Sequence, residues 1–256
     1  MTDRARKGSD PILLEKRDDR IAVITLNRPE AMNAINRAMT RALRDAIAEV
    51  ESDQDLDLLV LTGAGERAFC AGIDLKERTL LSDAQAAAYR TEELFPMYRE
   101  LDGRSKPAIA AVFGHTLAGG FELALACDLI VAAEGASFGL TEVKWGLIPA
   151  GGGCRKLPAL IGTARAKELI LTAKTLSAEE ALRLGVINQV VPREELRAAA
   201  LALAREILQN NQPAVRGAKR CIDESVAAHA ACDFDVEAAN RCYTTRNLTS
   251  WNKSPS

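Results

Sequence analysis

Short apolar runs that favour strands alternate along the chain with helical patterns, and this alternation restricts the fold more than any other feature. The first helix is expected to open at Asn36, after which apolar residues recur every three or four positions and form one stripe. Strands that alternate with crossover helices favour a parallel sheet covered by helices, so the sequence predicts an α/β fold. The expected strands cover residues 12–14, 21–26, 58–61, 108–112, 129–133 and 186–191.

Residues that cap helix N-termini mark further helices. Ser82 is expected to begin a long helix, and Pro96 should kink or shorten that helix because proline lacks an amide N–H. Ser177 opens a capping signature before another helix. From Glu194 onward the pattern is helical, with a break at residues 210–213.

No long linker, low-complexity tract or internal repeat divides the sequence. We therefore expect an α/β core over residues 1–192, followed by a helical region over residues 193–256. The pattern leaves open whether the helical region is a separate domain.

The overall charge argues against two classes of partner. The 256 residues carry a formal net charge of -2 and have a pI near 5.9, so no positive field attracts nucleic acid or an anionic membrane surface. Charged residues or glycine interrupt every apolar run before the roughly eighteen residues of a membrane helix, and residues 1–10 lack a signal-peptide pattern. We expect neither nucleic acid nor membrane as a partner.

The cysteines and histidines give little support for a metal site. No two of the six cysteines have the short spacing of a zinc ligand pair. Two histidines leave few candidates for a histidine-bound metal or a serine–histidine triad. We expect reduced thiols, no metal ion and a cytoplasmic location, which leaves the chemistry to carboxylates and backbone groups.

Two glycine-bearing segments stand where an expected strand gives way to a helix. Residues 69–76 follow the strand at 58–61, and residues 114–122 follow the strand at 108–112. Free N–H groups at the start of a helix stabilise an anion, and two such segments can aim two N–H groups at one oxygen. A thioester that becomes an enolate needs such donors. Taken alone, either segment is better explained by a tight turn or close packing.

Glu122 and Glu142 are acidic residues with unusual surroundings. Glu122 follows Gly119 by one helical turn inside an otherwise apolar run, and Glu142 comes later, beside another expected turn. A buried carboxylate is costly unless it has a partner or a task, and acids with a raised pKa exchange protons with water and a carbon acid. Ion pairs with Lys144 or Arg155, or a carboxylate at a helix start, explain the two acids equally well.

Several segments, in their order and spacing, resemble those of the enoyl-CoA hydratase/isomerase family, also called the crotonase family. They are IAVITLNRP at 21–29, FCAGIDLK at 69–76, LAGGFELA at 117–124 with ACD at 126–128, and EVKWGLIP at 142–149. The resemblance covers nearly the whole chain and is closest to the hydratases that carry two glutamates. It implies the crotonase (ClpP/crotonase-like) fold, in which β-β-α units stack and a helical C-terminal region, here 193–256, forms the trimer contacts. The implied assembly is a homotrimer or a dimer of trimers.

The resemblance also implies roles for single residues. The N–H groups of Ile73 and Gly119 would form an oxyanion hole around the thioester oxygen, and Glu122 and Glu142 would be the catalytic acids that handle the water and the proton. Residues 73–76 would line the adenine and pantetheine channel. No separate cofactor and no metal are implied, because coenzyme A is part of the substrate. The residues expected to contact the acyl-CoA are Arg28, Ala71, Ile73, Asp74, Leu75, Lys76, Ala118, Thr141 and Ala150.

Two acids favour hydration, and the expected function is an enoyl-CoA hydratase. Such an enzyme adds water reversibly, in the syn sense, to a 2-enoyl-CoA thioester through an enolate held in the oxyanion hole. The alternatives within the family are a double-bond isomerase or another enzyme of acyl-CoA enolates, including a methylglutaconyl-CoA hydratase, which residues 71–78 resemble. The alternative outside enzymology is an inactive module that binds an acyl-CoA or a protein.

A few positions depart from the family pattern or have two explanations. Ala150 stands where hydratases commonly have glycine, and Thr141 where many members have proline. Residues 240–247 lack the usual final helix, which often helps to cover CoA. Arg28, at a strand end, either meets the CoA phosphates or is an exposed arginine in a turn. The residues expected to serve packing before any acyl pocket are His115, Phe121 and Trp145.

Overall fold

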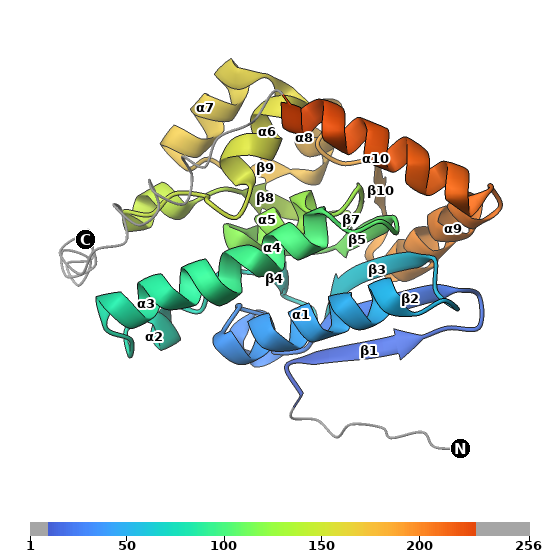
Figure 1. Ribbon diagram of the computed structural model, residues 1–256. Helices are drawn as coiled ribbons and strands as arrows, with labels where there is room; N and C mark the ends of the chain where they lie inside the picture. The colour runs from blue at the N-terminus through green and yellow to red at the C-terminus, as the bar shows by residue number, and fades with distance from the viewer. Residues whose placement is uncertain (1–9, 229–256) are drawn as a thin grey trace.

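The computed structural model describes residues 10–228 of the chain, and the predicted α/β fold is confirmed (Figure 1). The larger sheet contains β1 (Ile12–Lys16), β2 (Ile21–Leu26), β3 (Leu58–Gly63), β5 (Ala108–Val112), β7 (Leu129–Ala133) and β10 (Gln189–Val191). The strands lie in this order across the sheet. β1 pairs antiparallel with β2, and the other neighbours are parallel.

A smaller sheet lies beside the first. It contains β4 (Ala68–Cys70), β6 (His115–Leu117), β8 (Ser137–Gly139) and β9 (Leu176–Ser177), again in this order. β4, β6 and β8 are parallel, and β9 pairs antiparallel with β8. Each of β3, β5 and β7 is followed by a strand of the smaller sheet and then by helical residues. This arrangement is the predicted stack of β-β-α units, and it places the strand-to-helix junctions side by side.

The helices begin largely where the sequence predicts. They are α1 (Arg37–Ser52), α2 (Leu75–Arg78), α3 (Asp83–Tyr89), α4 (Phe95–Asp102), α5 (Gly119–Leu125), α6 (Gly153–Ile161), α7 (Thr163–Thr172), α8 (Ala178–Arg183), α9 (Leu196–Leu208) and α10 (Gln212–Ala228). Shorter helical turns are η1 (Pro29–Ala31), η2 (Arg90–Leu94), η3 (Glu142–Trp145) and η4 (Arg193–Glu195). The Asn36 side chain accepts a hydrogen bond of 2.9 Å from the Met39 N–H and so caps α1. Ser82 and Ser177 each open a helix with a capping box.

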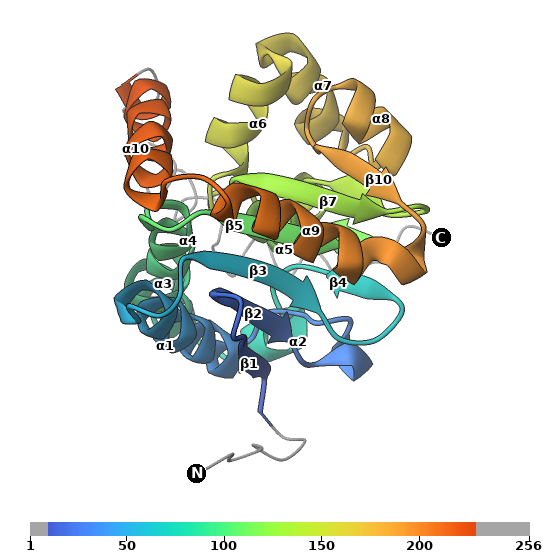
Figure 2. The same ribbon diagram turned by 90° about the vertical axis from the view of Figure 1, so that its right-hand side faces the viewer.

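The central strands β2, β3 and β5 of the larger sheet are buried on both faces, which explains their nearly continuous apolar runs. Side chains alternate between the faces along each strand. Ile24 and Leu61 pack in the cluster that includes α1, whereas Val23 and Val60 pack in the cluster that includes α9. Figure 2 shows α9 running across the strands of this sheet. The main core thus lies between the sheets and the helices that carry the site.

The expected kink at Pro96 takes the form of a wider turn. The π turn η2 joins α3 to α4, so the helical path continues through the proline. Proline has no N–H to donate to the carbonyl oxygen of Glu92, one turn earlier. Arg44 of α1 donates to that oxygen instead, at 3.1 Å. A residue far away in the sequence therefore replaces the bond that the proline cannot make.

The strand predicted at 186–191 is too long. β10 covers only its last three residues, Gln189–Val191. The Val186 N–H donates at 2.9 Å to the Ala181 carbonyl oxygen and so closes the end of α8. Residues 186 and 187 are buried apolar residues that follow the helix, which is why their composition resembles that of a strand.

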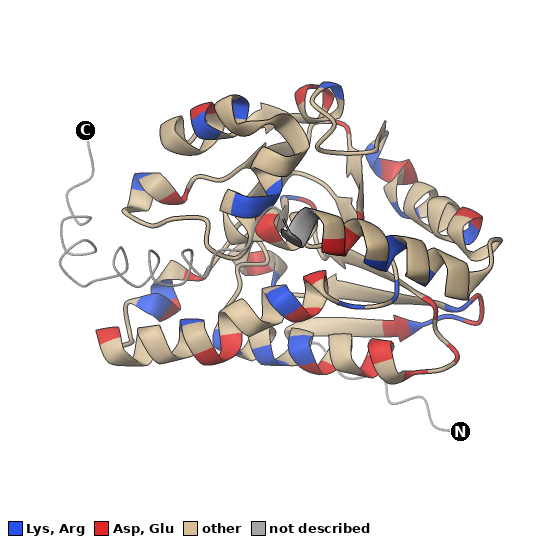
Figure 3. Cartoon of the chain, turned by 45° about the horizontal axis from the view of Figure 1, so that its top comes forward, with Lys and Arg blue, Asp and Glu red and all other residues tan. Residues whose placement is uncertain are grey.

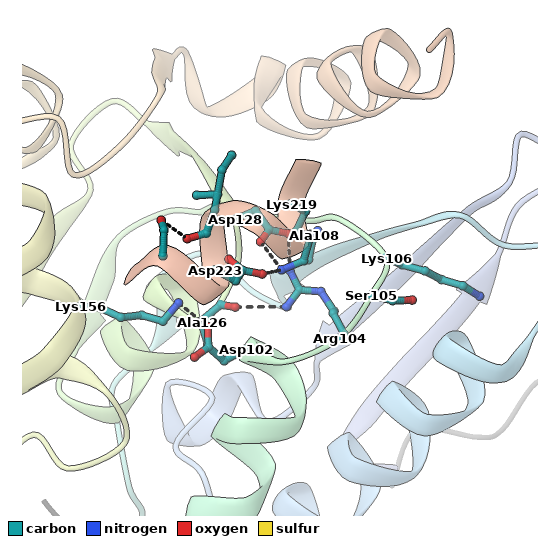
Figure 4. Close-up of polar contacts among 12 residues, drawn as sticks. Asp102, Arg104, Ser105, Lys106, Ala108, Ala126, Asp128, Lys156, Lys219 and Asp223 are labelled. Atoms are coloured by element: carbon teal, nitrogen blue, oxygen red, sulfur yellow. Dashed lines mark hydrogen bonds and ion pairs between the residues drawn. The ribbon is translucent and has the colours of Figure 1, made fainter. Parts of the chain in front are cut away.

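Charged side chains around Asp128 hold α10 against the sheets (Figure 4). Asp128 Oδ2 accepts hydrogen bonds of 2.7 Å from the Ala108 N–H and from the Arg104 guanidinium. Its Oδ1 pairs with Lys219 of α10 at 2.9 Å. Arg104 is buried, so loss of its partner would leave a charge shielded from water. One carboxylate thus joins the start of β5 to α10.

The C-terminal helices follow the predicted pattern. The predicted break separates α9 from α10, although Pro213 lies in the first turn of α10. The division into residues 1–192 and 193–256 stays a prediction, and residues 240–247 lie outside the described range. Between residues 10 and 228, no helix has the length and apolar character needed to cross a membrane. Basic and acidic residues are interspersed along the helices (Figure 3).

Two glycine-to-alanine substitutions should change stability in opposite directions. A Cβ on Gly120 would overlap the Cys70 carbonyl oxygen, so Gly120→Ala should lower the free energy of unfolding by roughly 1–3 kcal/mol. Gly217 lies in α10, and a Cβ added there would meet open space. Gly217→Ala should therefore raise the free energy of unfolding by about 0.5–1 kcal/mol. Urea denaturation measures both. Wild-type stability in Gly120→Ala would contradict the close packing of α5 on β4.

Candidate active site

The turn before α5 contains an alanine in a backbone conformation that favours glycine. Ala118 has φ 50° and ψ -129°, and such a conformation costs a non-glycine residue roughly 1–3 kcal/mol. Its N–H donates to the Gly139 carbonyl oxygen at 2.7 Å, and its own carbonyl oxygen accepts from the Phe121 and Glu122 amides. These bonds hold in place the peptide that carries the Gly119 N–H.

The two glycine segments predicted from the sequence lie against each other. Gly72 has φ +100°, and a Cβ there would lie 2.9 Å from Ala118 Cβ and 3.3 Å from the Gly119 nitrogen. A Cβ on Gly119 would in turn lie 3.6 Å from Ile73 Cγ1. Over residues 10–228, neither the Ile73 N–H nor the Gly119 N–H donates a hydrogen bond within the protein. The structure therefore brings two uncommitted amides into neighbouring turns.

Both predicted acids are buried near these turns. Glu122 is 4% exposed, and its Oε1 accepts a hydrogen bond of 2.9 Å from the N–H of Gly153, the first residue of α6. Glu142 begins η3 and is 5% exposed. In the part of the chain that the structure describes, neither carboxylate oxygen of Glu142 has a hydrogen-bond partner. Such burial is costly and must be offset by packing elsewhere.

The surroundings of the two acids differ, and this difference affects how readily each carboxyl group ionises. Burial raises the pKa of Glu142 well above the ordinary range of a glutamate, and the negative charge of Glu122 raises it further. The N-terminus of α6 directs an N–H at Glu122 and so stabilises negative charge there. Burial thus favours the neutral form of Glu142, and the two carboxyl groups interact with each other.

The sequence also allowed the two acids to be explained by ion pairs or by a position at a helix start, and the contacts in the structure bear on each explanation. Arg155 pairs with Asp102 at 2.5 Å, and Lys144 is exposed. The third alternative, a carboxylate at a helix start, does describe the bond between Glu122 and Gly153. Glu142 has no such bond among the described residues. Structural pairing thus explains part of the environment of Glu122 and none of the burial of Glu142.

An apolar cleft opens to solvent beside the Ile73 turn. It extends between α2, α3 and the segment after Glu142. Residues that line it include Ile73, Leu75, Ala86, Tyr89, Leu94 and Leu147. Ile73, whose N–H is one of the two uncommitted amides, lines this cleft, so an apolar ligand there would contact this residue.

The predicted contacts Arg28, Asp74 and Lys76 lie at the start of α2. Asp74 caps this helix, because its Oδ1 accepts from the Lys76 and Glu77 amides at 3.1 and 3.3 Å. Its Oδ2 accepts from Arg28 Nη2 at 2.9 Å, and Arg28 Nη1 donates to the Ala34 carbonyl oxygen at 2.5 Å. The guanidinium of Arg28 thus braces the loop, whereas the Lys76 side chain is exposed.

The remaining predicted contacts are half-buried. Thr141 immediately precedes Glu142, and Ala150 packs on the main core cluster. The Ala71 N–H donates to the Met32 carbonyl oxygen at 3.0 Å, which ties the first glycine segment to the turn after η1. Thr141 adjoins Glu142 and Ala71 adjoins Gly72 in the sequence, whereas Ala150 lies farther along the segment after Glu142.

Phe121, His115 and Trp145 differ in their surroundings, and Phe121 has the expected packing role. Phe121 is buried and packs on Phe138, with ring centroids 5.4 Å apart. His115 is exposed on β6, and its Nδ1 lies 3.1 Å from the Ser137 hydroxyl. Trp145 is 39% exposed at the end of η3. The Phe121 and His115 side chains therefore contribute to the core and the surface rather than to the cleft.

Sequence reasoning missed Tyr98 on α4. The side chain is 2% exposed, and its hydroxyl donates a hydrogen bond of 3.0 Å to the Gly119 carbonyl oxygen. Its position on an amphipathic helix indicated only a core residue. No local pattern links residue 98 to residue 119, because the contact depends on how α4 packs on α5.

Cys70 and Cys127 are buried and behave as small apolar residues. Burial raises the pKa of Cys70 and of Cys127 to about 12, so both thiols stay protonated. The Cys70 thiol donates to the Asn33 carbonyl oxygen at 3.1 Å. Within residues 10–228, no three histidine, cysteine, aspartate or glutamate side chains gather as they would around a metal ion.

Known proteins with similar sequences share one activity in their names. The family model described as enoyl-CoA hydratase/isomerase matches residues 16–253. A crotonyl-CoA hydratase from Syntrophomonas wolfei is 38% identical over 238 residues, which cover 92% of this chain and 91% of the relative. A short-chain-enoyl-CoA hydratase from Clostridium acetobutylicum is 37% identical, with 92% of this chain and 90% of the relative covered.

Solved structures give the same result. The crystal structure of an enoyl-CoA hydratase from Bacillus anthracis has a TM-score of 0.82 at 35% identity and covers 94% of this chain and 91% of its own. A probable enoyl-CoA hydratase from Mycobacterium thermoresistibile has a TM-score of 0.84 at 32% identity, with 94% and 97% covered. The predicted crotonase fold is confirmed by these matches. Sequence and fold together show that the chain belongs to the enoyl-CoA hydratase/isomerase family.

Proposed function

We propose that the chain is an enoyl-CoA hydratase, which adds water reversibly to the double bond of a 2-enoyl-CoA. The observation that carries the proposal is the buried pair Glu122 and Glu142 beside the uncommitted amides of Ile73 and Gly119. Hydration needs both parts, an electron sink at the thioester oxygen and two acid–base groups near one water. The relatives named as hydratases of crotonyl-CoA and of short-chain enoyl-CoA support the same reaction on a short acyl chain.

In the proposed reaction, the two amides bind the thioester oxygen and stabilise the enolate that forms as water adds. Glu122, ionised, takes a proton from the water while the water oxygen bonds to the β-carbon. Glu142 gives its proton to the α-carbon as the enolate collapses, which yields a 3-hydroxyacyl-CoA. The addition is syn because both acids act from one side of the substrate. Proton transfer between the acids, directly or through water, restores the starting state.

A double-bond isomerase is the main alternative. Isomerisation moves a proton along the acyl chain and needs one acid–base group, whereas this site buries two that interact. A methylglutaconyl-CoA hydratase would use the same site and differ only in the acyl group. An inactive binding module would gain nothing from two buried carboxylates that lower its stability. The acid pair therefore supports catalysis, and hydration above isomerisation.

We also propose that the start of α2 binds the CoA portion of the substrate. The Arg28–Asp74 pair fixes this turn next to Ile73, and the exposed ammonium of Lys76 projects from the same turn. A point charge of this kind suits phosphate oxygens. No bound cofactor beyond the substrate's CoA is required by this scheme.

We further propose a homotrimer or dimer of trimers in a cytoplasmic compartment. Apolar side chains such as Leu171 and Ile222, which are 71% and 62% exposed, support an assembly that covers them. Within the described part of the chain, no disulfide joins Cys70 or Cys127, and thiols of this kind support a reducing compartment.

Replacing either acid should abolish most of the hydration. Glu122→Gln and Glu142→Gln should each lower kcat for crotonyl-CoA by about 100- to 10,000-fold. Loss of the ultraviolet absorbance of the conjugated thioester measures the rate. Glu51→Gln is the matched control, because this half-buried glutamate accepts from the Ser105 N–H outside the site and should leave kcat unchanged. Full hydration by either site variant would contradict the two-acid scheme.

Glu142→Gln should also stabilise the protein toward neutral pH. The raised pKa of Glu142 means that the folded state binds this proton more tightly than the unfolded chain does. The resulting stabilisation is complete below the ordinary glutamate pKa and is lost as pH rises toward the folded pKa. Glutamine does not titrate in this range. The difference in free energy of unfolding between Glu142→Gln and the wild type should therefore grow, in favour of the variant, between about pH 5 and pH 8. Urea denaturation across this range measures the gain, and a gain that shrinks with pH would refute the raised pKa.

Lys76→Ala should weaken binding of the nucleotide end of the substrate. KM for crotonyl-CoA should rise on the order of tenfold, the loss expected for one charge-assisted hydrogen bond, with kcat little changed. KM for the crotonyl thioester of N-acetylcysteamine, which lacks the nucleotide, should stay the same. Lys174→Ala removes another exposed lysine and serves as the control. An equal rise in KM with both substrates would exclude a nucleotide contact.

A further inference from the structure

Tyr98 on α4 contacts the turn that carries one of the two uncommitted amides. Its hydroxyl donates to the Gly119 carbonyl oxygen at 3.0 Å. A Cβ on Gly119 would lie 2.5 Å from the hydroxyl oxygen, so the phenol touches the backbone of the turn directly. The reaction scheme gives this buried side chain no role.

The ring of Tyr98 also faces the segment that holds Glu122. A Cβ on Gly151 would lie 2.8 Å from two ring carbons of Tyr98 and 2.7 Å from Glu122 Oε2. Two residues later, the Gly153 N–H donates to Glu122 Oε1 at 2.9 Å. The ring is therefore wedged between the Gly119 turn and the residues that fix the carboxylate of Glu122.

The chemistry of Tyr98 limits what it can do. Burial raises the pKa of Tyr98 well above its ordinary value, and the negative charge of Glu122 adds to the rise. The hydroxyl thus keeps its proton and remains a hydrogen-bond donor. Gly119 follows Ala118, whose strained backbone would relax unless neighbouring contacts held it. A fixed donor on the Gly119 carbonyl is one such contact.

We propose that Tyr98 is a positioning residue that sets the spacing between the Gly119 amide and the Glu122 carboxylate. The hydroxyl anchors the oxyanion turn, and the ring keeps the turn at one distance from the segment that binds Glu122. The thioester oxygen and the water are thereby aligned for the same reaction step. This inference rests on the proposed function, because it assigns Gly119 to the thioester oxygen.

Tyr98→Phe tests the inference, since it keeps the ring and removes the hydroxyl. Loss of a whole oxyanion donor lowers kcat by about 100- to 1,000-fold. A donor that is only displaced should lower kcat on the order of tenfold, and KM for crotonyl-CoA should stay within about twofold of wild type. The direct readout is the infrared band of the thioester carbonyl in bound butyryl-CoA, labelled with ¹³C at that carbon. Two good donors should move this band to lower frequency in the wild type, and Tyr98→Phe should reverse part of the movement.

Thr62→Val separates positioning from a general loss of stability. It removes a bond of the same kind, from a hydroxyl to a backbone carbonyl, between Thr62 and Ala111 at 2.8 Å on the α9 side of the larger sheet. Its kcat and its carbonyl band should match the wild type even where its stability falls. A wild-type band and kcat in Tyr98→Phe would overturn the inference about Tyr98 alone. If butyryl-CoA bound to the wild type has the same carbonyl frequency as free butyryl-CoA, the proposed oxyanion hole is overturned, and this inference with it.

Discussion

The contact between Gly72 and the Ala118–Gly119 turn is the constraint on which the site depends. It follows from topology, because β4 and β6 are neighbours in the smaller sheet and each leads into one of the two turns. Any side chain at position 72 would push the turns apart. The strained conformation of Ala118 persists because its amide and carbonyl are both bonded to the surrounding fold. Close packing thus converts two ordinary strand-to-helix turns into a pair of adjacent donors.

The acid pair places a stability cost at the point where the chemistry is proposed to occur. Glu122 recovers part of that cost from the N-terminus of α6, whereas Glu142 is buried without a hydrogen-bond partner among the described residues. The apolar core on both faces of the larger sheet offsets the remainder. This asymmetry fits the proposed reaction, in which Glu142 carries the proton and Glu122 the charge. Burial of a carboxylate without a hydrogen-bond partner lowers stability, and such departures are typical of functional sites.

Local patterns predicted most of the fold, whereas the candidate site residues came from the resemblance to the family and stay a prediction. Caps such as Asn36 and Ser177 mark helix starts because a side chain bonds to the next turn, and such bonds are readable from short spacing. The features that sequence reasoning missed depend on residues far apart in the chain. Arg44 satisfies the carbonyl that Pro96 leaves open, and Tyr98 reaches Gly119 only after α4 packs on α5. Spacing within one segment contains no information about such contacts.

A crystal structure with a bound 2-enoyl-CoA would test the central claim most directly. The claim is that two backbone amides meet at one thioester oxygen while both acids face the adjoining carbons. The account predicts that this oxygen lies about 2.7–3.1 Å from the amide nitrogens of Ile73 and Gly119. Glu122 and Glu142 should then stand on the same side of the double bond. An oxygen bound away from either amide, or an acid turned from the double bond, would contradict it.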